Sequence, residues 1–152
     1  DKIYVSYGTH IHETYDNCMV IMDEYVDCGP IGGLHAGLKM CEQEAVMVAA
    51  CDMPLLGIEL YRFLWERMES HDQGVVPMVE GRIHPLAAIY KKEIVQIVEE
   101  QIEEQDYRLT DTLDRLNIHY VDLSDHPKFC RMLQNINTVT EYEELAGEGG
   151  TR

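Results

Sequence analysis

Positive charge is scarce in this sequence. Its 152 residues include 12 lysine and arginine side chains against 28 aspartate and glutamate side chains, a formal net charge of -16 at pH 7. A chain this acidic repels nucleic-acid backbones and anionic lipid surfaces, so we expect neither nucleic acid nor a membrane as a partner. An anionic small substrate would need a local correction to this field, from a metal ion or from backbone amides.

Paired cysteines and long apolar runs are also lacking. The five cysteines, at positions 18, 28, 41, 51 and 130, include no C-x-x-C pair and have no histidine at a matching spacing. We therefore expect neither a disulfide framework nor a zinc site, and a reducing cytoplasm is the compartment that fits. No apolar run approaches the roughly 18 residues that a membrane-spanning helix needs.

Repeats and linkers are absent too, which favours one domain. The length suits a single domain, and 45% hydrophobic content is enough for a continuous core. Thr140 and Glu143 have the spacing of a capping box and predict a last helix, which the glycines of 147–150 would end. We expect one domain over residues 1–146 and a flexible tail over 147–152.

The stretch from Ala45 to Pro54 carries the strongest signal. An unbroken apolar run from Ala45 to Ala50 predicts a strand buried on both faces, and Asp52 with the turn Met53-Pro54 follows it. Ligands gather just beyond the carboxyl ends of strands in an open parallel sheet, so Asp52 is a candidate ligand for a metal or a substrate. The alternative is that Asp52 only caps the following helix.

A second strand repeats this pattern. Cys18 to Met22 is apolar and ends at Asp23, so two strands could direct carboxylates into one crevice. The alternative for Asp23 is the start of a solvated acidic loop, because Glu24 and Asp27 follow it.

A glycine-rich segment lies between these two strands. Glycines over 29–33 precede a helix expected from about Gly33 to Cys41, and they would let backbone amides approach an anion or a base. The segment is neither G-x-G-x-x-G nor a P-loop, so an ordinary tight turn is the alternative.

Apolar periodicity predicts the other elements. A stripe of Tyr61, Leu64, Trp65 and Met68 predicts an amphipathic helix with Trp65 in the core. Strands at 74–79 and 86–90 predict an antiparallel hairpin, from which His84 could contact a substrate or serve as a structural hydrogen-bonding group. We further expect helices at 93–105 and 109–116, a strand at 118–123, and a loop with two incidental histidines, His10 and His12.

Four segments can be considered together in order and spacing: Gly29-Pro30-Ile31-Gly32-Gly33, Cys51-Asp52-Met53-Pro54, His84-Pro85-Leu86 and Asn135-Ile136-Asn137-Thr138. From about Ile3 to Leu145 the chain resembles the molybdenum cofactor guanylyltransferase family, a group of molybdopterin nucleotidyltransferase-like proteins. The resemblance implies a three-layer α/β/α, Rossmann-like nucleotidyltransferase fold, with a mostly parallel sheet and one antiparallel hairpin strand. It also implies transfer of GMP from GTP to molybdopterin, with release of pyrophosphate.

The resemblance assigns roles to particular residues. Asp52 matches the aspartate that binds Mg²⁺ and is the catalytic residue, while Asp23 and the loop residues Gly29, Pro30, Gly32 and Gly33 match positions at the guanine nucleotide. Ser6 and His84 are candidate substrate contacts, and the N-x-N-T segment is interpreted as architectural. GTP and the molybdenum cofactor are the implied partners, with transient contacts to molybdenum-cofactor-handling proteins.

One departure from the family is serious. The family begins with a strand and an L-A-G-G-x-S-x-R-M-G loop that cradles the triphosphate, and these residues do not contain it. We therefore expect that segment upstream of Asp1 and expect the 152 residues alone to be inactive. Two alternatives stay open: a related CTP or sugar-phosphate nucleotidyltransferase, and a non-catalytic nucleotide-binding module that has lost the phosphate loop.

Overall fold

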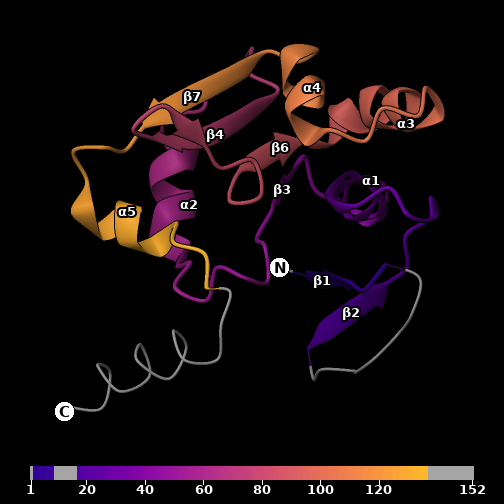
Figure 1. Cartoon of the computed structure of the whole chain (residues 1–152), viewed down its shortest axis with the longest axis horizontal. Helices are drawn as coiled ribbons and strands as arrows, with labels where there is room; N and C mark the ends of the chain where they lie inside the picture. The colour runs from indigo at the N-terminus through magenta and orange to yellow at the C-terminus, as the bar shows by residue number, and fades with distance from the viewer. Residues whose placement is uncertain (1, 9–16, 137–152) are drawn as a thin grey trace.

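The computed structural model describes residues 2–8 and 17–136, and its strands form two separate sheets (Figure 1). The small sheet pairs β1 (Ile3–Ser6) with β2 (Cys18–Ile21) in parallel. The large sheet contains β3 (Ala45–Met47), β4 (Gly74–Val79), β5 (Arg82–Ile83), β6 (Ile89–Lys91) and β7 (Ile118–Asp122). The helices are α1 (Pro30–Met40), α2 (Ile58–Trp65), the short 3-10 helix η1 (Lys92–Ile94), α3 (Val95–Glu103), α4 (Leu109–Asp114) and α5 (Pro127–Met132).

The large sheet is mixed, with most of its longer strands running in one direction. Strands β3 and β4 each pair antiparallel with β6, so they run parallel to each other, and β7 pairs parallel with β4. The short β5 forms a hairpin with β4 through the turn at Glu80 and Gly81, both of which have positive φ. The reversed β6 is the antiparallel strand expected from the sequence. The carboxyl ends of β3, β4 and β7 lie at the same end of the sheet, because these strands run in one direction.

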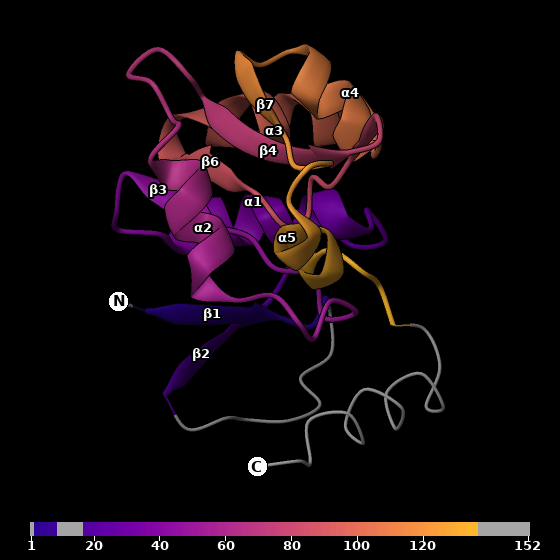
Figure 2. The ribbon, with the colours of Figure 1, turned by 90° about the vertical axis from the view of Figure 1, so that its left-hand side faces the viewer.

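Alternate side chains of the central strands point into two cores, which gives three layers. Val76 and Tyr90 join a cluster with side chains of α1, α3 and α4, whereas Val75 and Ile89 join a second cluster with side chains of α2. In Figure 2, α2 and α5 lie in front of the sheet and α1 and α3 lie behind it. The expected α/β/α architecture is confirmed.

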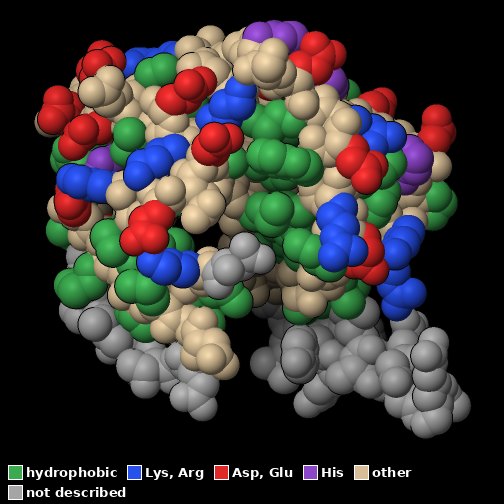
Figure 3. All heavy atoms as spheres, turned by 180° about the vertical axis from the view of Figure 1, so that it is seen from behind, with side chains coloured by type: hydrophobic (Ala, Val, Ile, Leu, Met, Phe, Trp, Pro, Cys, Tyr) green, Lys and Arg blue, Asp and Glu red, His purple; other side chains and the backbone are tan. Residues whose placement is uncertain are grey.

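Strand β3 differs from its expected burial. Its three residues are half-buried or exposed, and the side chain of Met47 is 52% exposed. The prediction of a strand buried on both faces was wrong, because in the described part of the chain β3 pairs along one edge only, with β6. Backbone hydrogen bonds from the Val48 and Ala50 N–H groups to the carbonyls of Ala88 and Leu86, at 2.8 and 2.9 Å, continue that pairing to Ala50. The view from behind in Figure 3 shows hydrophobic side chains at the surface beside a hollow in that face.

Helix α2 follows the expected amphipathic pattern with one error. Its buried residues are Leu60, Tyr61 and Leu64, and the Tyr61 hydroxyl donates to the Val48 carbonyl oxygen at 2.7 Å. Trp65, expected in the core, is the last residue of the helix and is 50% exposed. The buried stripe of α2 therefore includes Leu60 and Leu64, whereas the expected stripe included Trp65, one residue after Leu64.

Some expectations lie outside the described residues. These are the histidines His10 and His12, the helix starting near Thr140, and the tail over 147–152. Among the helices of residues 2–8 and 17–136, none is long and apolar enough to cross a membrane.

Candidate functional site

The first group of predicted site residues lies at the carboxyl ends of β1 and β2. Ser6, the last residue of β1, donates a hydrogen bond from Oγ to Asp23 Oδ1 at 2.5 Å. The Asp23 N–H donates to the Gly8 carbonyl oxygen at 3.1 Å. Two parallel strands and the turn after β1 thus fix a half-buried carboxylate at one place.

The glycine-rich loop brings the start of α1 against this carboxylate. Gly29 is the N-cap residue with φ at 66°, and Pro30 takes the first helical position, where its missing N–H is not needed. The helix therefore begins three residues earlier than expected. A Cβ at Gly32 would lie 3.2 Å from Asp23 Oδ2, and one at Gly33 would lie 3.2 Å from Ser6 Oγ.

These contacts give the glycines a role within the protein. The sequence suggested that they permit close approach of a ligand, and in the structure what approaches Gly32 and Gly33 is the pair Asp23 and Ser6. The structure therefore unites Ser6, Asp23, Gly32 and Gly33 in one group, with Gly29 and Pro30 exposed at its border.

The second group is built around Asp52, in the turn after β3. Asn135 Nδ2 donates to Asp52 Oδ2 at 2.8 Å, and the Ile136 N–H donates to the Asp52 carbonyl oxygen at 2.7 Å. Helix α2 begins at Ile58 with Gly57 as its N-cap residue, so Asp52 does not cap it. Asp52 is half-buried, and in the described part of the chain its carboxylate is held at Oδ2 by the Asn135 amide.

Asn135 is the residue that sequence reasoning missed. The N-x-N-T segment was interpreted as architectural, because nothing in the sequence connects it with an aspartate 83 positions earlier. The usable signal was its amide side chain, which can orient a carboxylate.

The His84 N–H donates to the Pro77 carbonyl oxygen of β4 at 2.9 Å. The loop that follows it pairs with β3, since the Leu86 carbonyl oxygen accepts from the Ala50 N–H, two residues before Asp52. The side chain of His84 is 8% exposed, and burial, with a smaller contribution from the Arg82 charge, lowers its pKa below the ordinary 6.5. A neutral imidazole at neutral pH follows from this burial.

Helix α1 connects the two groups mechanically. It packs against β1 on one side and against β3 on the other, and it also packs on α3. Asp23 and the glycine loop are therefore linked through α1 to the strand that leads to Asp52.

Comparisons with known proteins agree on the family. Residues 1–119 match the family model of the MobA-like NTP transferase domain. A protein of Carboxydothermus hydrogenoformans named "Probable molybdenum cofactor guanylyltransferase" is 32% identical over 132 residues, covering 85% of this chain and 66% of the relative. The "Molybdenum cofactor guanylyltransferase" of Syntrophotalea carbinolica is 30% identical over 153 residues, covering 98% of this chain and 73% of the relative.

A solved structure leads to the same conclusion. The molybdopterin-guanine dinucleotide biosynthesis protein A of Archaeoglobus fulgidus superimposes with a TM-score of 0.74 at 27% identity, covering 86% of this chain and 69% of that one. The chain thus spans about two thirds of the length of these relatives, and slightly less than two thirds of the Carboxydothermus protein. With the family match extending over most of its residues, the chain belongs to the family of MobA-like NTP transferase domains.

Proposed function

We propose that the full-length protein transfers the GMP part of GTP to the phosphate of molybdopterin and forms the guanine dinucleotide form of the molybdenum cofactor. A bond forms between a phosphate oxygen of molybdopterin and the α-phosphorus of GTP, and the bond from that phosphorus to the bridging oxygen breaks, so that pyrophosphate leaves. The observation that carries the proposal is the similarity to a molybdenum cofactor guanylyltransferase over 98% of the chain. The reaction would take place in the reducing cytoplasm, which fits five free cysteines.

Asp52 is the residue proposed to hold Mg²⁺. Its side chain suits that ion, because Mg²⁺ takes one or two carboxylates and completes its shell with phosphate oxygens and water. Asn135 occupies Oδ2 and leaves Oδ1 available. When bound, the ion neutralises charge on the phosphate oxygens around the reacting phosphorus.

Asp23 and the start of α1 are proposed to locate the guanine nucleotide. Ser6 fixes Oδ1 of Asp23, and the exposed Gly29 and Pro30 put the amino end of an 11-residue helix beside it. A fixed carboxylate accepts hydrogen bonds from the N–H donors of a purine base, and the start of α1 lies beside it. His84 remains a proposed substrate contact.

The triphosphate cradle is proposed to lie upstream of Asp1. The L-A-G-G-type loop does not occur in these 152 residues, and the relatives are longer than this chain. The chain alone would then lack its phosphate-binding loop and be inactive. Transient contacts with proteins that deliver or receive the molybdenum cofactor are part of the same proposal.

A transfer assay on the full-length protein tests this function. GTP, Mg²⁺ and molybdopterin are mixed with the protein, and pyrophosphate release and the dinucleotide product are measured, with CTP in place of GTP in a parallel reaction. We expect product from GTP and a loss of about a hundredfold or more in rate for Asp52→Asn, since an amide replaces a charged metal ligand. Asp114→Asn, at the exposed end of α4, is the matched control and should keep full activity. Turnover of CTP alone, or full activity of Asp52→Asn, would contradict the proposal.

A further inference from the structure

His35 is a buried histidine without a hydrogen bond in the structure. It lies on α1 with no exposed surface, and within residues 2–8 and 17–136 neither Nδ1 nor Nε2 has a hydrogen-bond partner. Its nearest charged neighbour is Glu99 of α3, whose Oε1 lies 3.7 Å from Nε2, beyond hydrogen-bond distance. Nearly all buried polar groups in proteins have a hydrogen-bond partner, so a buried imidazole without one calls for an explanation.

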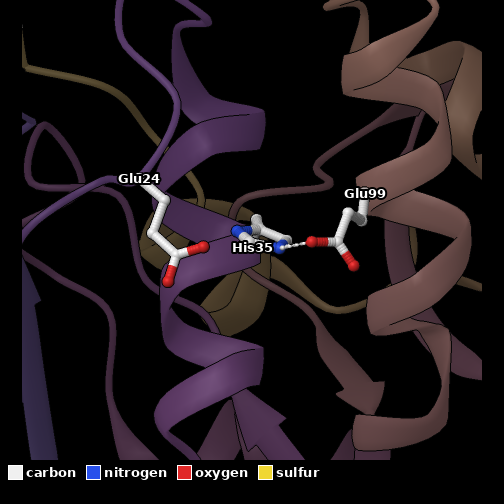
Figure 4. A group of neighbouring side chains, drawn as sticks. All are labelled: Glu24, His35 and Glu99. Carbon is white, nitrogen blue, oxygen red and sulfur yellow. Dashed lines mark ion pairs between the residues drawn. The ribbon is translucent and has the colours of Figure 1, made fainter.

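Two carboxylates accompany this imidazole. Glu24 lies in the segment between β2 and α1, and Figure 4 shows the His35 ring between the side chains of Glu24 and Glu99. One ligand atom from each of the three residues lies within 4.8 Å of the other two. The carboxylates are partly exposed, at 51% and 38%, so an ion from solvent can reach them.

Each carboxylate also has a neighbour of its own. Lys39 Nζ lies 2.6 Å from Glu24 Oε2, and the Tyr25 hydroxyl donates to Glu99 Oε1 at 3.3 Å. The Lys39 contact engages one oxygen of Glu24. Glu99 Oε1 both faces the imidazole and accepts the Tyr25 bond, and a carboxylate oxygen has a second lone pair with which to bind an ion. The Tyr25 ring packs edge-on against the His35 ring at 5.1 Å, which fixes the imidazole plane.

We propose that Glu24, His35 and Glu99 bind a divalent transition-metal ion, with Zn²⁺ as the best match. Imidazole with two carboxylates suits zinc, whereas Mg²⁺ prefers an all-oxygen shell. Bond lengths of about 2.0–2.1 Å in a tetrahedral shell place ligand atoms about 3.3–3.5 Å apart, so the flexible glutamates move inward by about an ångström. A water molecule takes the fourth position.

The ion would act on structure and not on the transfer reaction. It would join α1, the segment after β2 and α3, three pieces that otherwise meet mainly through apolar packing of α1 on α3. Glu24 follows Asp23 directly, and α1 carries Gly32 and Gly33, so the same ion would fix the Asp23 group. The site is separate from Asp52, which lies in the turn after β3.

Zinc binding to the full-length protein tests the proposal. ZnCl₂ is titrated calorimetrically, and the melting temperature is recorded with and without zinc. We expect one tight equivalent in the unaltered protein, and a loss of about a hundredfold or more in its affinity in the double variant Glu24→Gln with Glu99→Gln. Both substitutions keep side-chain size, and glutamine at 99 can still accept the Tyr25 hydrogen bond, so the variant should fold.

Two controls make the result specific. Glu100→Gln, an exposed neighbour on α3, should keep the zinc equivalent, and so should Asp52→Asn, which separates this site from the proposed catalytic one. Retention of the zinc equivalent by the double variant would assign it to cysteines or other histidines and overturn the proposal. Absence of zinc binding in the unaltered protein would also overturn it.

Discussion

At the scale of single residues, the geometry of the Asp52 site depends on the side-chain amide of Asn135. Its Nδ2 orients the Asp52 carboxylate across 83 positions of sequence, and the Ile136 N–H holds the Asp52 backbone at the same time. A ligand carboxylate that is oriented in this way binds a metal better than one free to rotate. Asn135 is therefore a positioning residue for Asp52.

Removal of this amide should reduce activity more than stability. We expect Asn135→Ala in the full-length protein to raise the Mg²⁺ concentration needed for half-maximal GMP transfer by about tenfold to a hundredfold, with a small change in melting temperature. Rate measurements over a Mg²⁺ series, beside the exposed neighbour variant Gln134→Ala, check this. An unchanged Mg²⁺ requirement would mean that the Asn135 bond to Asp52 is only structural.

His84 should make stability depend on pH in a defined direction. Burial holds its pKa below 6.5 in the folded protein, so the unfolded chain binds the proton more readily as pH falls through about 6.5. The contribution of His84 to the free energy of unfolding is therefore fully present above about pH 6.5 and is lost as the pH falls below it. Urea unfolding of the full-length protein at about pH 7.5 and 5.5 should therefore show a smaller loss of stability in His84→Gln than in the unaltered protein. An equal loss in both proteins would contradict this assignment.

Single residues at strand ends were predictable, and their distant partners were not. Asp23 and Asp52 each follow an apolar run that ends abruptly, and the structure places Asp23 just after β2 and Asp52 in a turn further beyond the end of β3. The Ser6 contact with Asp23 and the Asn135 contact with Asp52 arise from tertiary folding, which leaves no periodic trace in the sequence.

At the scale of elements, the start of α1 is the tightest junction. Its first turn packs so closely on Asp23 and Ser6 that no Cβ fits freely at Gly32 or Gly33, whereas a Cβ at Gly37 of the same helix has nothing within 4 Å. A branched side chain at either tight position would displace the Asp23 carboxylate or the Ser6 hydroxyl.

This contrast within one helix gives a matched experiment. We expect Gly32→Val and Gly33→Val to weaken GTP binding to the full-length protein by about tenfold or more. The valine side chain would displace Asp23 or Ser6, which are proposed to locate the guanine nucleotide. Gly37→Ala should leave GTP affinity unchanged and raise stability by about 0.5–1 kcal/mol. Calorimetric GTP titrations and thermal melts measure both. Lower melting temperatures with unchanged GTP affinity in the valine variants would restore the interpretation of the loop as an ordinary tight turn.

Element type followed from periodicity wherever a core face existed. The helix over 93–105 is realised as η1 and α3, and the strand over 118–123 as β7. Helix α5 was not anticipated, because it has six residues, none of them fully buried, and of these Phe129 and Met132 pack against the second core. The burial of β3 was overestimated, because an apolar run indicates what a strand can bury and not which neighbours are present.

At the scale of the whole molecule, the arrangement of the two sheets is the main question. In the described part of the chain, β1 pairs only with β2 and β3 pairs only with β6, so each has an edge without a partner. Helix α1 packs on both β1 and β3, so the two strands lie near each other (Figure 1). Ile3 on β1 and Met47 on β3 are 58% and 52% exposed, which is unusual for strands of such apolar composition.

We propose that one further strand, from a segment upstream of Asp1, pairs between β1 and β3 and joins the two sheets. It would bury side chains such as Ile3 and Met47, each worth about 1.5–3 kcal/mol when fully buried, and satisfy both open edges. Against a typical domain stability of about 5–15 kcal/mol, losing several such contributions removes most of the stability. Open edges are also templates for aggregation.

The 152 residues alone should therefore be unstable, prone to aggregation and unable to bind GTP. Supplying the upstream segment, in the same chain or as a co-expressed peptide, should restore a single species in solution and GTP binding together, because the proposed segment would both complete the sheet and supply the phosphate loop. Size-exclusion profiles, thermal melts and GTP titrations of the 152-residue chain with and without the segment compare the two states. A monodisperse 152-residue chain with a cooperative melt and micromolar, Mg²⁺-dependent GTP binding would contradict the proposal. Folding would then not need a further strand, and GTP binding would not need a phosphate loop from outside these residues.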